Sequence, residues 1–191
     1  MESFAQNCLD NHTCFRLLLQ AMSRPGKIFQ MPDSFGTTFV TTLIRLLDSV
    51  LDQQSSCHLI NDNSELEHKI KNRTGVQFTD AESADFLLAL SGSSQGKSTS
   101  AKRGRRDFPD EGATIIFGID KLTDGTQETG IKLTGPGIKD TVYPQIEGLG
   151  DEELNQLEMI NVEFPLGIDS IFLDQDSRLM CIPRSTRFGG N

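Results

Sequence analysis

The sequence has few of the residues and patterns that mark metal sites, membrane spans or export. Its four cysteines, Cys8, Cys14, Cys57 and Cys181, form no Cys-x-x-Cys pair, and its three histidines lie far apart. This spacing argues against a zinc-finger-type site, and we expect reduced thiols. Apolar runs such as Phe86 to Leu90 are far too short to cross a bilayer. The amino terminus lacks the basic and apolar stretches of a secretory signal, so we expect a cytoplasmic protein.

Positive charge is also scarce. The chain holds 18 Lys and Arg against 27 Asp and Glu, which gives a formal net charge of −9. Such a balance argues against general affinity for nucleic acid or an anionic membrane. A basic cluster is the local exception, and it consists of Lys97, Lys102, Arg103, Arg105 and Arg106. The cluster could attract a phosphate-rich ligand or an acidic partner, although a solvated surface loop is the simpler interpretation.

The length of 191 residues and the 36% hydrophobic content predict one soluble domain over residues 1–191. Apolar periodicity predicts helices over residues 9–23 and 32–51. Capping signals predict a short exposed helix from Ser64 that stops at Gly75, and a last helix over residues 151–160. Helical and strand patterns alternate in the first half, and hairpins dominate the second. The sequence therefore predicts an α/β fold in which one mixed sheet is flanked by helices.

Several local structures can be predicted more closely. Phe15, Leu18, Leu19 and Met22 recur at helical spacing and predict one apolar face of the first helix. The branched run 113–119 predicts a strand that pairs with residues 130–134 through the polar turn 123–126. A second hairpin is predicted for the strands around 168–173 and 178–183, with the acidic turn 174–177 between them. Residues 91–109, rich in Gly, Ser and basic residues, predict a flexible loop.

No motif in the sequence makes a strong case for catalysis. The stretch Gly92 to Thr99 resembles a phosphate-binding loop, but three residues separate its glycines where that loop requires four. The Asp174-x-Asp176 pair lacks the following ligands of a calcium loop and is interpreted as a hairpin turn. No Ser-His-Asp, paired-carboxylate or Cys-His constellation can be assembled.

Four segments together resemble one known family. They are His12-x-x-Phe15-Arg16 with Pro25-Gly26, Leu-Thr-Gly-Pro-Gly-Ile at 133–138, Phe-Pro-Leu-Gly-Ile-Asp at 164–169, and Ile-Pro-Arg-Ser-Thr at 182–186. In this order they resemble the PhnH family, the H subunit of the bacterial carbon-phosphorus lyase core complex. The likeness spans roughly residues 9–187 and is far more specific than any single short motif.

The resemblance implies a fold, a set of partners and a role. The PhnH family is similar to the large domain of pyridoxal-phosphate-dependent transferases but lacks their cofactor site, so we expect no bound cofactor. It implies a homodimer and partner subunits of the G, I and J types. The chain is then expected to be non-catalytic by itself, yet required when the ribose triphosphate moiety of ATP is transferred to methylphosphonate in phosphonate catabolism.

The matching segments supply candidate contact or structural residues rather than catalytic ones. They are His12, Phe15, Arg16, Pro25, Gly26, Gly135, Gly137, Phe164, Pro165, Gly167, Asp169, Pro183 and Arg184. Two alternative functions stay open at this point. One is a stand-alone nucleotide or phosphonate transferase that holds phosphates with the basic loop 97–106. The other is an acidic regulatory binding module that would be a stable monomer.

Overall fold

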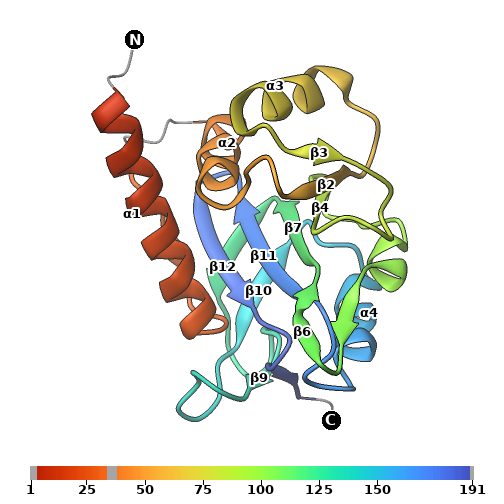
Figure 1. Ribbon diagram of the computed structural model, residues 1–191. Coiled ribbons are helices and arrows are strands. Elements are labelled where there is room, and N and C mark those ends of the chain that lie inside the picture. Colours follow the sequence, from red (N-terminus) through yellow and green to blue (C-terminus); the bar gives the residue numbers. More distant parts are fainter. Residues whose placement is uncertain (1–3, 34–37, 190–191) are drawn as a thin grey trace.

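The computed structural model describes residues 4–33 and 38–189 (Figure 1). Among these residues, side chains are described from Leu9 onward. Its helices are α1 (Phe4–Ser23), α2 (Phe39–Val50), α3 (Ser64–Thr74), α4 (Glu153–Ile160) and the 3-10 helix η2 (Lys97–Ser100). Part of the predicted start of the second helix falls on residues 34–37, which lie outside the described residues. Thr38 caps α2, because its side chain accepts a hydrogen bond from the Thr41 amide.

The strands form one large mixed sheet and three two-stranded pairs. The large sheet has the order β1-β12-β11-β7-β4-β2-β3. Its strands are β1 (Phe29–Gln30), β2 (Ser56–Leu59), β3 (Gln77–Phe78), β4 (Phe86–Ala89), β7 (Thr114–Ile119), β11 (Asp169–Asp174) and β12 (Arg178–Ile182). The pairs are β5 (Arg103–Arg105) with β6 (Phe108–Gly112), β8 (Lys121–Asp124) with β10 (Pro144–Glu147), and β9 (Leu133–Thr134) with β13 (Arg187–Phe188).

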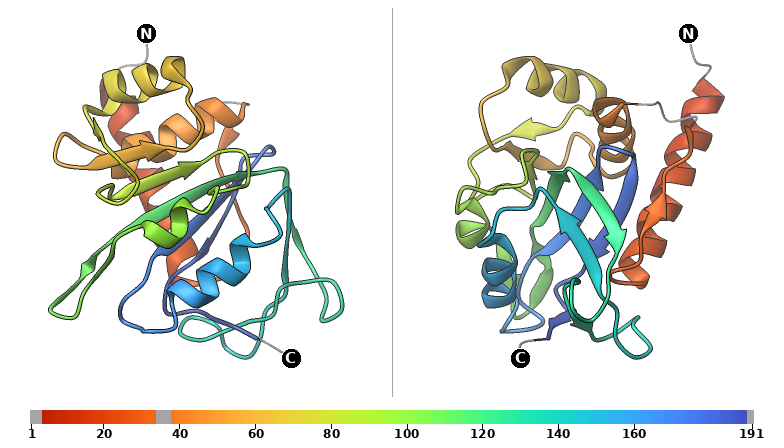
Figure 2. Two further views of the ribbon diagram at one scale, coloured as in Figure 1. Left: turned by 90° about the vertical axis from the view of Figure 1, so that its right-hand side faces the viewer. Right: turned by 180° about the vertical axis from the view of Figure 1, so that it is seen from behind.

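The central strands are apolar on both faces, so the sheet has two separate cores. Ile116 and Ile171 point to one core, which α1, α2 and α3 cover. Phe117 and Phe172 point to the other, where their rings stack with centroids 5.3 Å apart. Figure 2 shows α4 and η2 on this second side. This alternation follows from the two-residue period of a strand and confirms the predicted mixed sheet flanked by helices.

The outer helix α1 packs against the core through only part of the predicted apolar stripe, because Leu18 is buried and Met22 packs against the core. Cys14, Leu18 and Ala21 are buried against the sheet and α2. Phe15 and Leu19 instead remain 43% and 52% exposed. The buried face of α1 therefore combines Leu18 with the small residues Cys14 and Ala21, while Phe15 and Leu19 are left on the outer surface.

The second-half topology is confirmed in one hairpin and corrected in the other. β11 and β12 pair antiparallel through the acidic turn, as predicted. The predicted pairing of 113–119 with 130–134 is wrong, because β7 runs parallel to both β4 and β11. The chain after β7 forms β8, which pairs with β10, and the later β9 pairs with β13. β7 is buried nearly throughout, and burial on both faces is typical of a parallel central strand.

Residues 91–109 contain more regular structure than the sequence predicts. They include η2, the whole of β5 and the start of β6. The β5–β6 hairpin has an irregular register near Gly104, whose φ of +77° favours glycine. Over residues 4–33 and 38–189, no helix combines the length and hydropathy needed to cross a membrane.

Candidate functional site

Three of the family segments and the end of the first one meet at one end of the large sheet. The chain leaving β12 passes through Pro183 and Arg184 toward β13. The Gly26 amide donates to the Cys181 carbonyl at 3.1 Å, which fixes the end of the first segment beside β12. Gly137 lies so close to Ser23 and Pro25 that a Cβ at position 137 would overlap the Ser23 carbonyl. The segments are therefore joined as one structural unit. We call this unit, which consists of Pro25-Gly26 and residues 133–138, 164–169 and 182–186, the motif junction.

An ion pair between Asp169 and Arg184 lies at the centre of the motif junction. The Arg184 amide donates to Asp169 Oδ1 at 2.8 Å, and Arg184 Nη2 donates to Oδ2 at 2.6 Å. Arg184 Nη1 also donates to the Pro109 carbonyl at 2.6 Å. A long contact of 3.5 Å joins Nη2 to the carbonyl of Gly112. Arg184 Nε donates to both Asp169 carboxylate oxygens at 3.2 Å, so all three guanidinium nitrogens are engaged and the arrangement suits Arg184 for holding β6, β11 and β12 together.

The loop between α4 and β11 is closed by Asn161. Its Nδ2 donates to the Ile168 carbonyl at 3.1 Å, and its Oδ1 accepts from the Ile168 amide at 2.8 Å. Gly167 packs directly against the Asn161 side chain. Its φ is +146°, and a Cβ at this position would overlap Asn161 Oδ1. The Phe164-Pro165 peptide bond in the same loop is cis. Sequence reasoning missed Asn161, because nothing in its local pattern reveals a contact with Ile168.

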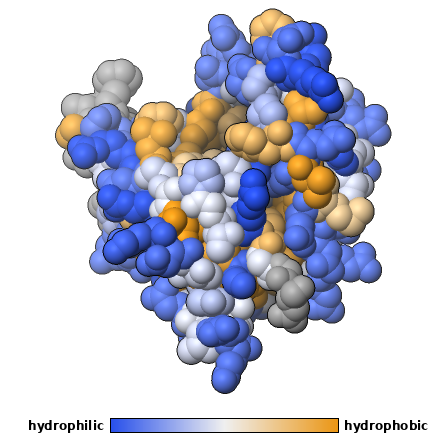
Figure 3. Space-filling view, turned by 90° about the horizontal axis from the view of Figure 1, so that it is seen from below, coloured by the Kyte–Doolittle hydropathy of each residue, from blue (hydrophilic) through white to orange (hydrophobic). Residues whose placement is uncertain are grey.

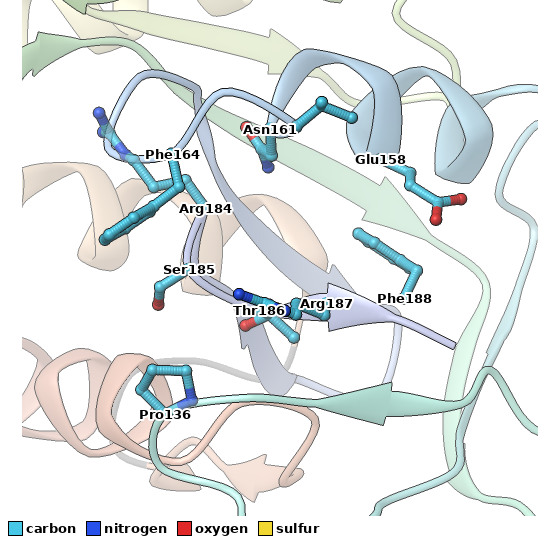
Figure 4. A pocket seen from close by; sticks show the side chains of 10 residues that line it. Pro136, Glu158, Asn161, Phe164, Arg184, Ser185, Thr186, Arg187 and Phe188 are labelled. Carbon is cyan, nitrogen blue, oxygen red and sulfur yellow. The ribbon is translucent and has the colours of Figure 1, made fainter. Parts of the chain in front are cut away.

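A cavity of about 480 Å³ opens beside the motif junction. The residues that line it are Pro136, Glu158, Asn161, Val162, Phe164, Arg184, Ser185, Thr186, Arg187 and Phe188. Figure 4 shows these side chains between the end of α4, the following loop, and the chain that enters β13. Seen from below, the molecule is hollowed and carries apolar side chains among hydrophilic ones (Figure 3).

Exposed apolar side chains gather on the chain that forms one wall of this cavity. Met159, Val162 and Phe164 keep 73%, 74% and 62% of their surface exposed. Scattered apolar residues on a surface are ordinary, but several together beside a hollow are typical of an interaction site. The geometry is therefore better suited to binding than to chemistry.

The structure separates the sequence candidates into two groups. One group lies in or beside the motif junction and consists of Pro25, Gly26, Gly135, Gly137, Phe164, Pro165, Gly167, Asp169, Pro183 and Arg184. The other group, His12, Phe15 and Arg16, lies on the exposed outer face of α1. His12 precedes Ser23 by eleven residues, which corresponds to about 16 Å along the helix axis. The first segment therefore contributes to two different surfaces.

The basic cluster does not form a single cationic surface. Lys102 forms an ion pair with Asp85, and Arg105 forms one with Glu111 at 2.7 Å. Burial raises the pKa of Asp85, but hydrogen bonds from Lys102 and Ser56 bring it below its ordinary value. Two members of the cluster are thus neutralised by neighbouring carboxylates, which weakens the case for a phosphate-binding loop.

The loop that resembles a phosphate-binding motif holds a carboxylate of its own chain. Glu153 Oε1 accepts from the Ser94 amide at 2.7 Å and from the Ser94 hydroxyl at 3.0 Å. The Ser93 hydroxyl donates to the same oxygen at 3.3 Å. A phosphate bound by this loop would need the same donors. The Glu153 carboxylate already occupies them, so a phosphate would have to displace it. This explains the serine-rich composition of the segment by a structural role.

Metal and thiol chemistry gain no support from the geometry. Within the described residues, no three His, Cys, Asp or Glu side chains are grouped so that they could hold a metal ion. Cys14, Cys57 and Cys181 are buried and free. Burial raises the pKa of Cys14 to about 11 and that of Cys57 to about 12, and it also raises the pKa of Cys181. These thiols are therefore protonated at neutral pH and poor nucleophiles.

Comparison with known proteins identifies the family. The family model described as bacterial phosphonate metabolism protein (PhnH) matches residues 2–189. The chain is also 29% identical over 174 residues to a protein of Stutzerimonas stutzeri named putative C-P lyase subunit protein HtxG. That match covers 91% of this chain and 83% of the relative. Because the family model matches nearly the whole chain, the chain belongs to the PhnH family of bacterial phosphonate metabolism proteins.

Proposed function

We propose that this chain is a non-catalytic subunit of a carbon-phosphorus lyase assembly that acts in the catabolism of organic phosphonates. The observation that carries the proposal is membership of the PhnH family over nearly the whole chain. The name of the Stutzerimonas stutzeri relative supports it, because that protein is called a C-P lyase subunit. The internal ion pair of Arg184 supports it further, since the charged residues of the motif junction bind one another and leave apolar side chains to face a partner.

The proposal extends to the reaction of the assembly. Together with subunits of the G, I and J types, the chain supports transfer of the ribose triphosphate moiety of ATP to methylphosphonate. Its own contribution is to hold and shape the complex in the cytoplasm. The parallel strands β11, β7, β4, β2 and β3 with helices on both faces are compatible with kinship to the large domain of pyridoxal-phosphate-dependent transferases.

The direct test compares the assembly with and without this chain. Adenine release from ATP is measured in the presence of methylphosphonate, and the chain alone is assayed beside the complex. We expect the complete assembly to release adenine, the assembly without the chain to lose most of that activity, and the chain alone to release none. Turnover of ATP by the chain alone would instead favour a stand-alone transferase, and Arg103→Ser with Arg106→Ser would then test the basic cluster.

We also infer that the chain forms a homodimer through the outer face of α1. Leu9 and Leu19 stand five residues on either side of Cys14, while His12 and Arg16 stand two residues on either side. An antiparallel pair of such helices would place each leucine near the opposite leucine of the second copy. Phe15, close to the midpoint, would lie in the centre of the contact.

The dimer inference is tested by molar mass in solution. Changing Phe15 and Leu19 together to Ser removes two of the exposed apolar side chains of α1, including the one at the centre of the contact, so the double variant is expected to be a monomer with an unchanged circular dichroism spectrum. Phe108→Ser provides the matched control, because Phe108 is similarly exposed on a different element, β6. Light scattering that finds the α1 variant as a dimer would rule out this face.

A further inference from the structure

The short strand β13 has one edge that is paired and one that is open. Arg187 and Phe188 pair with Thr134 and Leu133 of β9, in an antiparallel two-stranded ladder. The Gly189 amide donates to the Lys132 carbonyl at 2.7 Å. Because hydrogen-bonding groups alternate between the two edges of a strand, the amide and carbonyl of Phe188 point away from β9.

The open edge faces the cavity described above. Residues 185–188 line that cavity in succession, so it runs along the strand. In Figure 4, β9 lies along one side of β13, and the end of α4 with the loop carrying Phe164 lies on the other side. The gap between β13 and this loop is therefore an elongated groove that leaves backbone donors and acceptors uncovered. Such edges are templates for pairing with another chain.

A buried hydroxyl in the groove lacks a partner. Thr186 is buried, and its Oγ1 makes no hydrogen bond with any described residue. Buried polar groups are nearly always hydrogen-bonded, because an unpaired one destabilises the fold. The hydroxyl belongs to a residue that lines the cavity. It is therefore placed to bond to a group that enters the groove.

The side chains around the groove define what it can receive. Phe164 and Phe188 supply apolar walls, and the high exposure of Phe164 and Val162 leaves that surface uncovered. Arg187 is exposed and forms no ion pair in the part of the chain that is described. Glu158 also lines the cavity, but the two are not within ion-pair distance. An apolar side chain and an acidic side chain on one extended segment would match these walls.

We propose that the groove between β13 and the Val162–Phe164 loop binds an extended segment of another subunit by strand addition. The segment bonds to the Phe188 amide and carbonyl, inserts an apolar side chain between Phe164 and Phe188, and directs a carboxylate to Arg187. This proposal rests on the proposed function, since it requires that the chain works within an assembly. Backbone pairing supplies affinity in this mode of recognition, while the alternate side chains supply specificity.

The test uses the assembly of the other subunits, purified without this chain, as the probe. Its affinity for wild-type chain is compared with that for Phe164→Ala and Arg187→Glu. Central aromatic contacts are often worth about 2 kcal/mol or more, so we expect the Phe164 variant to bind roughly 30-fold more weakly or worse. Phe108→Ala is the control, because it removes a similarly exposed ring outside the groove, and its affinity should equal that of the wild type.

Two further measurements separate binding in the groove from a merely structural role. Hydrogen exchange at the Phe188 amide should slow when the assembly binds, because strand addition gives that amide a partner. Thr186→Val keeps the shape of the side chain and removes the unpaired hydroxyl. This variant should be at least as stable as the wild-type chain, yet it should bind the assembly more weakly. A structural role alone would not combine these two effects.

The outcomes are distinguishable from failure of the proposed function. If wild-type chain binds the assembly but the groove variants bind equally well, strand addition is overturned and the subunit role stands. If wild-type chain does not bind at all, both proposals fail. If inorganic phosphate alone protects the Phe188 amide while the assembly does not, the groove is a small-anion site and strand addition is also overturned.

Discussion

The ion pair between Asp169 and Arg184 provides the sharpest test of the motif junction. We expect Asp169→Asn, which preserves shape but removes the charge, to destabilise the isolated chain substantially. Breaking a fully buried ion pair from one side costs about 3–5 kcal/mol, whereas a solvent-exposed pair contributes about 0–1 kcal/mol. Only 21% of the Asp169 side chain and 13% of the Arg184 side chain are exposed to solvent. The pair lies nearer the buried limit, so we expect a loss of about 2–3 kcal/mol.

The assay is urea unfolding of the chain alone, followed by far-ultraviolet circular dichroism. A double-mutant cycle with Arg184→Met measures the interaction itself. Because the two side chains share one network, we expect a coupling energy of about 2 kcal/mol. Asp140→Asn is the control, since Asp140 is exposed and its replacement should stay within about 0.5 kcal/mol of the wild type. A loss below about 1 kcal/mol for Asp169→Asn, or a coupling near zero, would refute the central role of this pair.

Three further predictions follow from other parts of the molecule. Gly167→Ala should lower the free energy of unfolding more than Gly96→Ala, because both have positive φ but only a Cβ at 167 collides with Asn161; equal losses in urea would contradict this reading. The pKa of Asp85 is lower in the folded chain than in the unfolded chain. Its carboxylate therefore stabilises the fold above the unfolded-state pKa, and this contribution is lost as the pH falls through the folded-state pKa. Asp85→Asn should therefore reduce stability at pH 7 but not in strong acid, and a pH-independent difference would disprove the linkage with Lys102. The three buried thiols should resist iodoacetamide at pH 8 until the chain unfolds, as peptide mass spectrometry would reveal, and rapid native labelling would contradict their burial.

The sequence predicted the mixed sheet and the hairpin β11–β12 because these depend on local patterns. The acidic turn between the two strands is stabilised locally: Asp174 Oδ1 accepts from the Asp176 and Arg178 amides at 2.9 and 2.8 Å. The partners of β7 could not be predicted in the same way. Strand pairing over long separations is set by burial of the whole sheet, and a nearby strand pattern is only one of several possible partners.

Two other differences have clear physical causes. On α1, the hydropathy pattern grouped Phe15 and Leu19 with Leu18, but only Leu18 is buried. The small side chains of Cys14 and Ala21 turn the contact with the core away from Phe15 and Leu19. In the segment 91–109, the serines look like solvent-exposed loop residues when only their neighbours are considered. Ser94 is instead buried and bonded to Glu153, which lies 59 residues further along the chain. A partner so distant leaves no trace in the local sequence.

The residues of the motif junction divide by physical role, and this division carries the functional argument. Gly137 and Gly167 allow backbone approaches that a side chain would block, while Asp169 and Arg184 neutralise each other inside the fold. None of these four is free to act on a substrate without first losing a structural contact. Phe164, in contrast, is exposed although the loop that carries it is fixed on both sides. The hydrogen bonds between Asn161 and Ile168 fix this loop with the Phe164 ring exposed to solvent. Exposure of the ring does not stabilise the isolated chain, and we therefore propose that a partner covers this surface.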